Sequence, residues 1–302
     1  MEREAVIRVK DLYKVYRMGD TKVYALNGVD FEIYRGEFCA ITGPSGSGKS
    51  TLLNMLAGLE HPSKGEIVIA KKHIERLNER QLVAFRRERV GFIFQSYNLI
   101  ATLNALENVA LPLSFRGIGR TARNKQARQY LKLVGLERFM KHMPNQMSGG
   151  QQQRVGIARA LAVSPQIIFA DEPTGNLDSK TTMEILRLMK KIVREQNQTL
   201  VMVTHDNNLA TYADRIFKII DGKIVHIEEG HQEVDLLEAE QAAETREETA
   251  EVPGRETSDQ KAAKKETEEQ EFAGKKAGAE NLTEQQTEDK RQGDQDEKVG
   301  ED

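Results

Sequence analysis

Hydrophobic and polar positions alternate with a period of two over the first part of the chain. Residues 6–16 and 23–34 show this alternation, and Gly19 with Asp20 between them favours a turn, so two antiparallel strands are expected. The apolar residues 67–69 add a further strand to this set. The pattern therefore predicts an antiparallel β subdomain in the N-terminal part of the chain.

Four short and continuous apolar runs are typical of strands that are buried on both faces of a parallel sheet. They cover residues 38–41, 90–94, 167–170 and 200–203. Asn78 with Gln81 marks one helix start between these runs, and Ser179 is expected to cap another helix. Residues 216–220 and 223–227 are expected to form a closing hairpin. These elements predict an α/β fold with a mostly parallel sheet.

Apolar residues recur at helical spacing from about residue 97 to residue 165, between two halves of the strand set. A helical stretch in this place predicts an α-helical subdomain that is inserted into the α/β core.

Composition changes sharply after residue 230. Residues 1–230 carry 34 Lys/Arg and 24 Asp/Glu, a formal charge of +10, whereas residues 231–302 carry 10 and 23, a formal charge of −13. The second segment is acidic, of low complexity and poor in large apolar residues, so we expect it to be disordered. It is either a solvated tail or a partner-binding arm. We therefore predict one folded domain over residues 1–230 and a tail over residues 231–302.

The sequence also indicates in which cellular compartment the chain is expected. The single cysteine, Cys39, lies in an apolar run and has no intramolecular partner, so we expect a core residue and no oxidising compartment. No run approaches the about 20 apolar residues that a membrane-spanning helix needs, and the N-terminus lacks a signal-peptide pattern. A cytoplasmic protein is expected. The basic charge of residues 1–230 is compatible with nucleotides, nucleic acid or an anionic membrane face, and does not choose among them.

Residues 43–51 form the strongest local motif. They follow an apolar strand, precede a helical run and fit the phosphate-binding pattern G-x-x-x-x-G-K-[ST]. Glycines allow backbone N–H groups to point at phosphate oxygens, and the following helix adds its N-terminal dipole. A turn without a ligand does not explain the Lys-Ser-Thr at this offset. The candidate phosphate-binding residues are Gly43, Pro44, Ser45, Gly46, Ser47, Gly48, Lys49, Ser50 and Thr51.

Two adjacent carboxylates, Asp171 and Glu172, close the apolar run at 167–170. Carboxylates at the end of a buried strand are costly unless a cation or a hydrogen-bond network compensates them. Asp171 is therefore a candidate magnesium ligand near Ser50, and Glu172 is a candidate to orient or deprotonate water. The alternative is a solvated acidic turn. His205 follows the next strand, at the end where open α/β sheets bind ligands, although a histidine in this place can also be purely structural.

Three further features are ambiguous in the residues alone. Tyr16 either stacks on a planar adenine or is an ordinary aromatic residue at a strand end. Gln95 closes a buried strand and needs a polar partner or solvent. Residues 148–151, Ser-Gly-Gly-Gln, combine capping-box spacing with a glycine-rich helix start, so they form either an ordinary helix start or a second anion site.

The order of these features resembles the ATP-binding subunit of an ABC transporter over about residues 6–228. The resemblance makes residues 43–51 the Walker A loop, Gln95 the Q-loop glutamine, and Asp171 with Glu172 the end of Walker B. It also implies that Ser148, Gly149, Gly150 and Gln151 form the ABC signature. Asp178 is then the D-loop aspartate, His205 the switch histidine and Tyr16 the adenine-stacking aromatic. Met147 stands where the signature usually has leucine, an apolar exchange of similar volume.

The fold implied by this resemblance is a P-loop NTPase core of the RecA-like kind. The implied cofactors are ATP and Mg2+, with Ser50, Gln95 and Asp171 at the metal and with Glu172 and His205 as catalytic residues. Two copies would face head to tail, so that ATP on one Walker A loop is covered by the signature of the other copy. One chain then carries two half-sites.

Residues 94–100, 105–109 and 170–178 are similar to the branch that contains lipoprotein-release, macrolide-export and antimicrobial-peptide-resistance systems. The resemblance implies an integral membrane permease as partner, a cytoplasmic location on the inner face of the cell membrane through that permease, and no nucleic-acid partner. Two rival interpretations are a soluble ABC-type ATPase acting on ribosomes or DNA, and a regulatory subunit that only binds ATP. The acidic tail is not explained by the resemblance.

Overall fold

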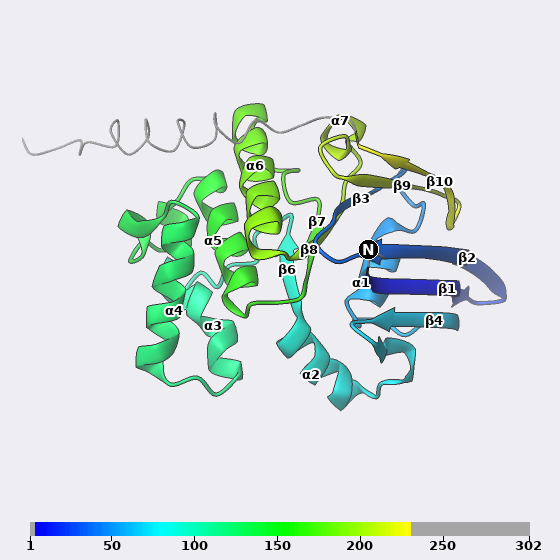
Figure 1. The fold of residues 1–302 in the computed structure, drawn as a ribbon, viewed down its shortest axis with the longest axis horizontal. Coiled ribbons are helices and arrows are strands. Elements are labelled where there is room, and N and C mark those ends of the chain that lie inside the picture. The colour runs from blue at the N-terminus through cyan, green and yellow to red at the C-terminus, as the bar shows by residue number, and fades with distance from the viewer. Residues whose placement is uncertain (1–3, 231–302) are drawn as a thin grey trace, which may run out of the picture. The chain divides into compact units, whose positions relative to one another are not determined.

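An antiparallel sheet forms the N-terminal part of the protein in a computed structural model that describes residues 4–230 (Figure 1). Its strand order is β2-β1-β4-β5, and the strands are β1 Ala5–Met18, β2 Thr21–Tyr34, β4 Lys64–Ile69 and β5 Lys72–His73. The β1–β2 pair is antiparallel and sets Tyr16 opposite Val23. The predicted antiparallel sheet is confirmed.

A six-stranded sheet with the order β10-β9-β3-β8-β7-β6 forms the centre of the fold. Its strands are β3 Phe38–Thr42, β6 Val90–Phe94, β7 Ile167–Asp171, β8 Thr199–Val203, β9 Arg215–Ile220 and β10 Lys223–Glu229. All its neighbouring strands are parallel except β10, which pairs with β9 as the predicted hairpin. The predicted α/β fold is confirmed. Parallel strands end at one edge, so the residues after β3, β7 and β8 are brought together there.

Helices alternate with these strands. They are α1 Lys49–Leu56, α2 Glu79–Arg89, α3 Ala105–Phe115, α4 Arg120–Leu133, α5 Gly149–Ala162, α6 Ser179–Gln196 and α7 Asn207–Ala210, with the short 3-10 helices η1 Ile74–Arg76, η2 Glu137–Phe139 and η3 Pro144–Gln146. In Figure 1, α3, α4 and α5 lie together on the side of the central sheet away from the antiparallel sheet. The helical character of residues 97–165 agrees with the sequence pattern; their status as a separate subdomain stays a prediction.

The start of α6 differs from the sequence expectation. Ser179 was expected to be the cap, but it is the first helical residue, and the N-cap is Asp178. The Asp178 carboxylate accepts hydrogen bonds from the backbone N–H of Thr181 at 3.0 Å and from its Oγ1 at 2.6 Å. A carboxylate one residue earlier satisfies a free N–H of the first turn and suits the positive end of the helix dipole, so it displaces the serine as cap.

Two apolar cores lie on opposite faces of the central sheet. Strand β3 shows the division, because Phe38 and Ala40 belong to the core shared with α3, α4, α5 and α6, whereas Cys39 and Ile41 belong to the core shared with the antiparallel sheet and α1. Cys39 is fully buried, as predicted, and burial raises the pKa of its thiol well above the usual value. Both faces of β3 are therefore covered, and the end of β3 that leads into the phosphate loop is held between two packed layers.

Within residues 4–230, no helix has both the length and the apolar character that crossing a membrane requires. The acidic segment 231–302, predicted to be a disordered tail, lies outside the described residues.

Candidate functional site

The loop between β3 and α1 has the backbone geometry that its glycines allow. Gly43 and Gly48 adopt φ values of 155° and 102°, which side-chain-bearing residues rarely take. A Cβ atom on Gly43 would lie 2.1 Å from the carbonyl oxygen of Ile219, and one on Gly48 would lie 2.3 Å from that of Ala25. Both positions therefore require glycine for the loop to pack against its own chain.

Polar groups of this loop are arranged to receive an anion. The Lys49 side chain is nearly buried, and its Nζ donates to the carbonyl oxygens of Gly43 and Pro44, each at 2.8 Å, so the ammonium lies across the loop. The Ser47 Oγ is buried and has no hydrogen-bond partner among residues 4–230. Helix α1 starts at Lys49 without a side-chain cap on its first N–H groups. An ammonium, an unpartnered hydroxyl and free N–H groups at one loop suit phosphate oxygens.

The carboxylates at the end of β7 lie at the same sheet edge. Burial raises the pKa of Asp171, the neighbouring Glu172 raises it further, and the Lys49 ammonium opposes both effects. Ile41 on β3 pairs with Val203 on β8, and Val203 pairs with Asp171 on β7, so β7 ends at the same edge as the phosphate loop that follows β3. Glu172 follows in a left-handed conformation with φ of 44°, which turns the chain away from the strand direction.

A histidine from the neighbouring strand completes this edge. Strand β8 pairs with β7 so that Val203 lies opposite Asp171, and His205 follows two residues later. The Nδ1 of His205 is 3.0 Å from Oε1 of Glu172. The structure therefore places the phosphate loop with Lys49, the Asp171–Glu172 pair and His205 at one edge of the central sheet, and it brings Glu172 and His205 into direct contact.

Residues 148–151 form the start of α5, as predicted. The backbone N–H of Ser148 donates to Oε1 of Gln151 at 3.0 Å, and the backbone N–H of Gln151 donates to the Ser148 Oγ at 3.3 Å, so the capping box is present. Across residues 4–230, no hydrogen bond or ion pair joins this helix start to Lys49, Glu172 or His205. The chain thus presents a second glycine-rich helix start that is separate from the phosphate loop.

The two glycines of this start are also required by packing inside the chain. A Cβ on Gly149 would lie 2.8 Å from Oη of Tyr97, and a Cβ on Gly150 would lie 2.6 Å from Cγ2 of Thr181. The sequence does not predict these roles of Tyr97 and Thr181, because neither residue belongs to a pattern that indicates contact with α5.

Gln95 and the turn after Glu172 are packed together. The Gln95 carbonyl oxygen accepts from Nδ2 of Asn176 at 3.1 Å, and a Cβ on Gly175 would lie 2.7 Å from Nε2 of Gln95. Gln153 on α5 donates from Nε2 to the carbonyl oxygen of Pro173 at 2.5 Å. The Gln95 segment, α5 and the turn after β7 are therefore in direct contact.

Asp178 ends this turn as the cap of α6. The Asp178 carboxylate accepts hydrogen bonds from the Thr181 hydroxyl and from the Thr181 backbone N–H, and these bonds, in that order of size, lower the pKa of Asp178. Asp178 is thus ionised and exposed at the end of the segment that begins with Glu172.

Tyr16 is partly exposed at 37% of its surface. Its hydroxyl donates to Oε2 of Glu60 at 2.6 Å, and Nζ of Lys14 lies 5.1 Å from the ring centroid. Burial and then the Glu60 contact raise the pKa of Tyr16. The Tyr16 side chain is therefore held by its hydroxyl and by the Lys14 ammonium over its ring, at a partly exposed position where an aromatic ring can meet a planar base.

A magnesium ion at this site would take oxygen ligands both from this chain and from substrate phosphates and water. Among the described residues, no group of three or more His, Cys, Asp or Glu side chains could hold a metal. A divalent magnesium ion is usually bound by one or two carboxylates together with substrate phosphates and water. The donor chemistry of Asp171, Ser50 and Gln95 fits that mode, since a cation would relieve the burial of the Asp171 charge.

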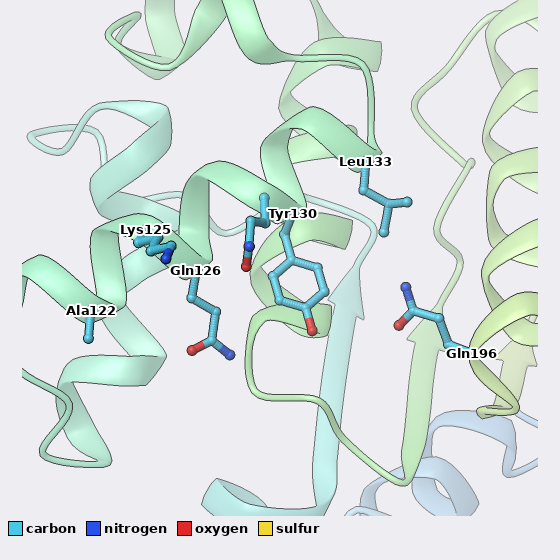
Figure 2. A pocket seen from close by; sticks show the side chains of 7 residues that line it. Ala122, Lys125, Gln126, Tyr130, Leu133 and Gln196 are labelled. Carbon is cyan, nitrogen blue, oxygen red and sulfur yellow. The ribbon is translucent and has the colours of Figure 1, made fainter.

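A shallow hollow of about 560 Å³ lies along α4 and reaches the end of α6 (Figure 2). It is lined by Ala122, Lys125, Gln126, Gln129, Tyr130, Leu133 and Gln196. Among the described residues that line it, none is a predicted site residue and none carries a carboxylate. This hollow is not the nucleotide site.

A glycine-rich loop between a buried strand and a helix, with carboxylates at the end of a nearby parallel strand, defines a P-loop nucleotide-binding protein. The family model described as ABC transporter matches residues 26–175. The uncharacterized ABC transporter ATP-binding protein MJ0796 of Methanocaldococcus jannaschii is 50% identical over 223 residues, which are 72% of this chain and 95% of that protein. The chain belongs to the family of ABC transporter ATP-binding proteins, and it is an ATPase of that family.

A solved structure and two relatives refine this placement. The structure, described as a dimeric post-hydrolysis state of the MJ0796 cassette bound to ADP and Pi, has a TM-score of 0.69 and 47% identity, covering 75% of this chain and 99% of that chain. The lipoprotein-releasing system protein LolD of Geobacter metallireducens is 42% identical over 221 residues, 73% of this chain and 98% of LolD. The macrolide export ATP-binding/permease protein MacB of Wolinella succinogenes is 44% identical over 227 residues, 75% of this chain and 35% of MacB. The resemblance inferred from the sequence is confirmed.

Proposed function

We propose that this chain hydrolyses ATP in a head-to-tail dimer and thereby powers a separate membrane permease. The observation that supports it most directly is the meeting of Lys49, Asp171, Glu172 and His205 at one sheet edge. ATP would bind through residues 43–51, with the adenine on the exposed face of Tyr16. The Lys49 ammonium would move from the loop carbonyls to the β and γ phosphates, because a phosphate is the stronger acceptor.

Hydrolysis is assigned to Glu172 and His205. Glu172 would orient the attacking water and accept its proton, as a carboxylate with a neighbouring imidazole can do. The Nδ1 of His205 is 3.0 Å from Glu172, which leaves its other ring nitrogen free to face the γ-phosphate and fix the water geometry. Mg2+, when bound by Asp171, Ser50 and Gln95, would neutralise charge on the phosphate oxygens.

The separate position of residues 148–151 supports a dimeric site. Ser148, Gly149, Gly150 and Gln151 would cover the γ-phosphate on the Walker A loop of a second copy, and Asp178 would lie at the same interface. ATP between the copies would drive closure by its phosphate contacts, and hydrolysis would remove the charge that holds the copies together. The dimeric MJ0796 cassette supports this arrangement.

Export or extraction of a lipophilic substrate, a lipoprotein or a peptide is the transport that we propose. LolD is named as part of a lipoprotein-releasing system, and MacB is named as a combined ATP-binding and permease protein. The partner that we propose is a separate integral membrane permease, which would hold this chain at the inner face of the membrane. These relatives favour transport over action on ribosomes or DNA.

A Glu172→Gln variant tests the assignment. It keeps the size of the side chain but removes the base, so ATP should bind and close the dimer while hydrolysis falls by about a hundredfold or more. Gel filtration with ATP and magnesium should show a dimer for Glu172→Gln and a monomer for the Glu172→Gln, Lys49→Ala double variant. A Glu172→Gln protein that hydrolyses ATP at the parent rate would sink the assignment of Glu172.

A further inference from the structure

Arg159 on α5 contacts the chain segment that follows Gln95. Its guanidinium donates to the carbonyl oxygen of Asn98 at 2.5 Å and to that of Tyr97 at 2.8 Å. It also lies 6.0 Å from the ring centroid of Phe94, the last residue of β6. One side chain of α5 therefore touches the residues on both sides of Gln95.

The surroundings of Arg159 are unusual for a cation. Burial lowers the pKa of Arg159. In the part of the chain that the structure describes, it forms no ion pair with a carboxylate, so its charge is compensated by two carbonyl dipoles. A desolvated guanidinium is costly, and carbonyls offset it only when they are held close and aligned with its planar fork.

Those two carbonyls come from a strained turn. Tyr97 and Asn98 adopt φ values of 57° and 48°, two successive left-handed residues without a glycine. Side-chain-bearing residues are disfavoured in this region, and the conformation persists only where the surroundings fix it. The Arg159 guanidinium donates to both carbonyl oxygens when Tyr97 and Asn98 are in this conformation, so it stabilises the turn. That turn sets the direction of the chain at Gln95.

The same loop also contacts the start of α5. The Tyr97 ring lies so close to Gly149 that a Cβ there would meet its Oη at 2.8 Å. Arg159 and Gly149 are ten residues apart on α5, so the helix contacts Tyr97 through two residues whose backbones are about 15 Å apart along the helix axis. A shift of α5 along or around its axis must therefore move the loop.

We propose that Arg159 is a positioning residue that couples the position of the signature helix α5 to the position of Gln95. This inference rests on the proposed function, since it assigns to Arg159 the placement of a residue that would contact the nucleotide site. When residues 148–151 close on a second copy, the pull on α5 reaches the Gln95 segment through the two bonds of Arg159. Hydrolysis, more than ATP binding, should depend on this link.

Arg116 provides a matched control. Its guanidinium also donates to backbone carbonyls, those of Arg87, Glu88 and Val163 at 2.8, 2.9 and 2.7 Å, and burial also lowers the pKa of Arg116. Within residues 4–230, no hydrogen bond or ion pair joins Arg116 to the 95–98 segment. Arg116→Gln should therefore reproduce the loss of a half-buried guanidinium anchor without removing a bond to the segment around Gln95.

The experiment compares the full chain with its Arg159→Gln, Arg159→Lys and Arg116→Gln variants. ATP affinity, kcat and the urea midpoint of unfolding are measured for each. The chain contains no tryptophan, so a Ser96→Trp substitution at an exposed position beside Gln95 adds a reporter without background. Emission of that reporter is followed on addition of ATP in each background.

We expect Arg159→Gln to keep its ATP affinity within about threefold of the parent and to lose about tenfold or more in kcat, because misplacement of a site group acts on the chemical step. The ATP-dependent change in reporter emission should be lost as well. Arg159→Lys should have a kcat and an emission change between those of the parent and Arg159→Gln, since lysine keeps the charge but not the planar fork. If Arg159→Gln does not fold, Arg159→Lys is compared with Arg116→Gln instead. Arg116→Gln should keep kcat and the emission change.

Equal kcat values and emission changes in Arg159→Gln and Arg116→Gln would overturn the inference and leave the proposed function standing. A parent chain that neither binds nor hydrolyses ATP would overturn both.

Discussion

Replacing Gly150 by alanine tests how closely the start of α5 packs against α6. The added Cβ would lie 2.6 Å from Cγ2 of Thr181, well inside the contact distance of about 3.5–4.0 Å between carbon atoms. Thr181 is β-branched and stiff, and turning Cγ2 away would break the 2.6 Å hydrogen bond from its Oγ1 to Asp178. The clash can be relieved only by giving up another contact or by shifting a helix.

The size of the effect follows from two opposing terms. Overpacking typically costs about 1–3 kcal/mol. A glycine-to-alanine exchange in a helix otherwise gains up to about 1 kcal/mol, because alanine loses less conformational freedom. The terms partly cancel in the single variant, so its stability is a weak test. Thr181→Ser removes Cγ2 and keeps the hydroxyl, and in that background only the gain should remain.

A double-mutant cycle therefore isolates the contact. The free energy of unfolding is measured in urea, without nucleotide, for the parent, Gly150→Ala, Thr181→Ser and the double variant. We expect a coupling energy of about 1–2 kcal/mol, with the double variant more stable than the sum of the single effects. Gly119→Ala is the control, because a Cβ there meets no atom within 4 Å. A coupling energy below about 0.5 kcal/mol, the usual error of additivity, would refute the packing argument.

Two further predictions concern buried polar groups. Burial and then Glu172 raise the pKa of Asp171 above its ordinary value of 3.8, so ionisation of Asp171 destabilises the folded state. This loss of stability is absent below pH 3.8, grows as the pH rises through the raised pKa, and is complete above the raised pKa. Asp171→Asn should thus unfold at higher urea than the parent at pH 7, a difference that shrinks toward pH 4; a constant difference would contradict this. Asn108 is fully buried and accepts from the Ile100 N–H at 2.8 Å. Asn108→Ala should lower the free energy of unfolding by about 1–3 kcal/mol, and a loss below about 0.5 kcal/mol would contradict that reasoning.

Local patterns predicted most of the fold. The apolar runs at β3, β6, β7 and β8 are continuous because both faces of these strands are covered, so their sequence carries the signal of a parallel sheet. The capping boxes of α2 and α5 are equally local, since their hydrogen bonds span three residues.

Contacts between distant segments were beyond sequence reasoning. The N-cap of α6 could not be decided, because Asp178 and Ser179 are both good caps and only the path of the chain chooses between them. Arg159, Tyr97 and Thr181 carry no motif, and their partners lie 30 to 60 residues away or more. The candidate phosphate-binding residues can be recognised from a sequence pattern, whereas the residues that hold the loops in place are recognised only in the structure.

The central claim is that one copy of the chain holds only half of each hydrolytic site. The phosphate loop with Lys49, Glu172 and His205 lies at one sheet edge, whereas within residues 4–230 no hydrogen bond or ion pair joins residues 148–151 to Lys49, Glu172 or His205. The most direct test is the ATPase rate per mole of chain, measured with ATP and magnesium over a wide range of protein concentration. We predict that this specific rate rises in proportion to concentration while monomers dominate and levels off when dimers dominate. A specific rate that stays constant down to the lowest concentration would contradict the account.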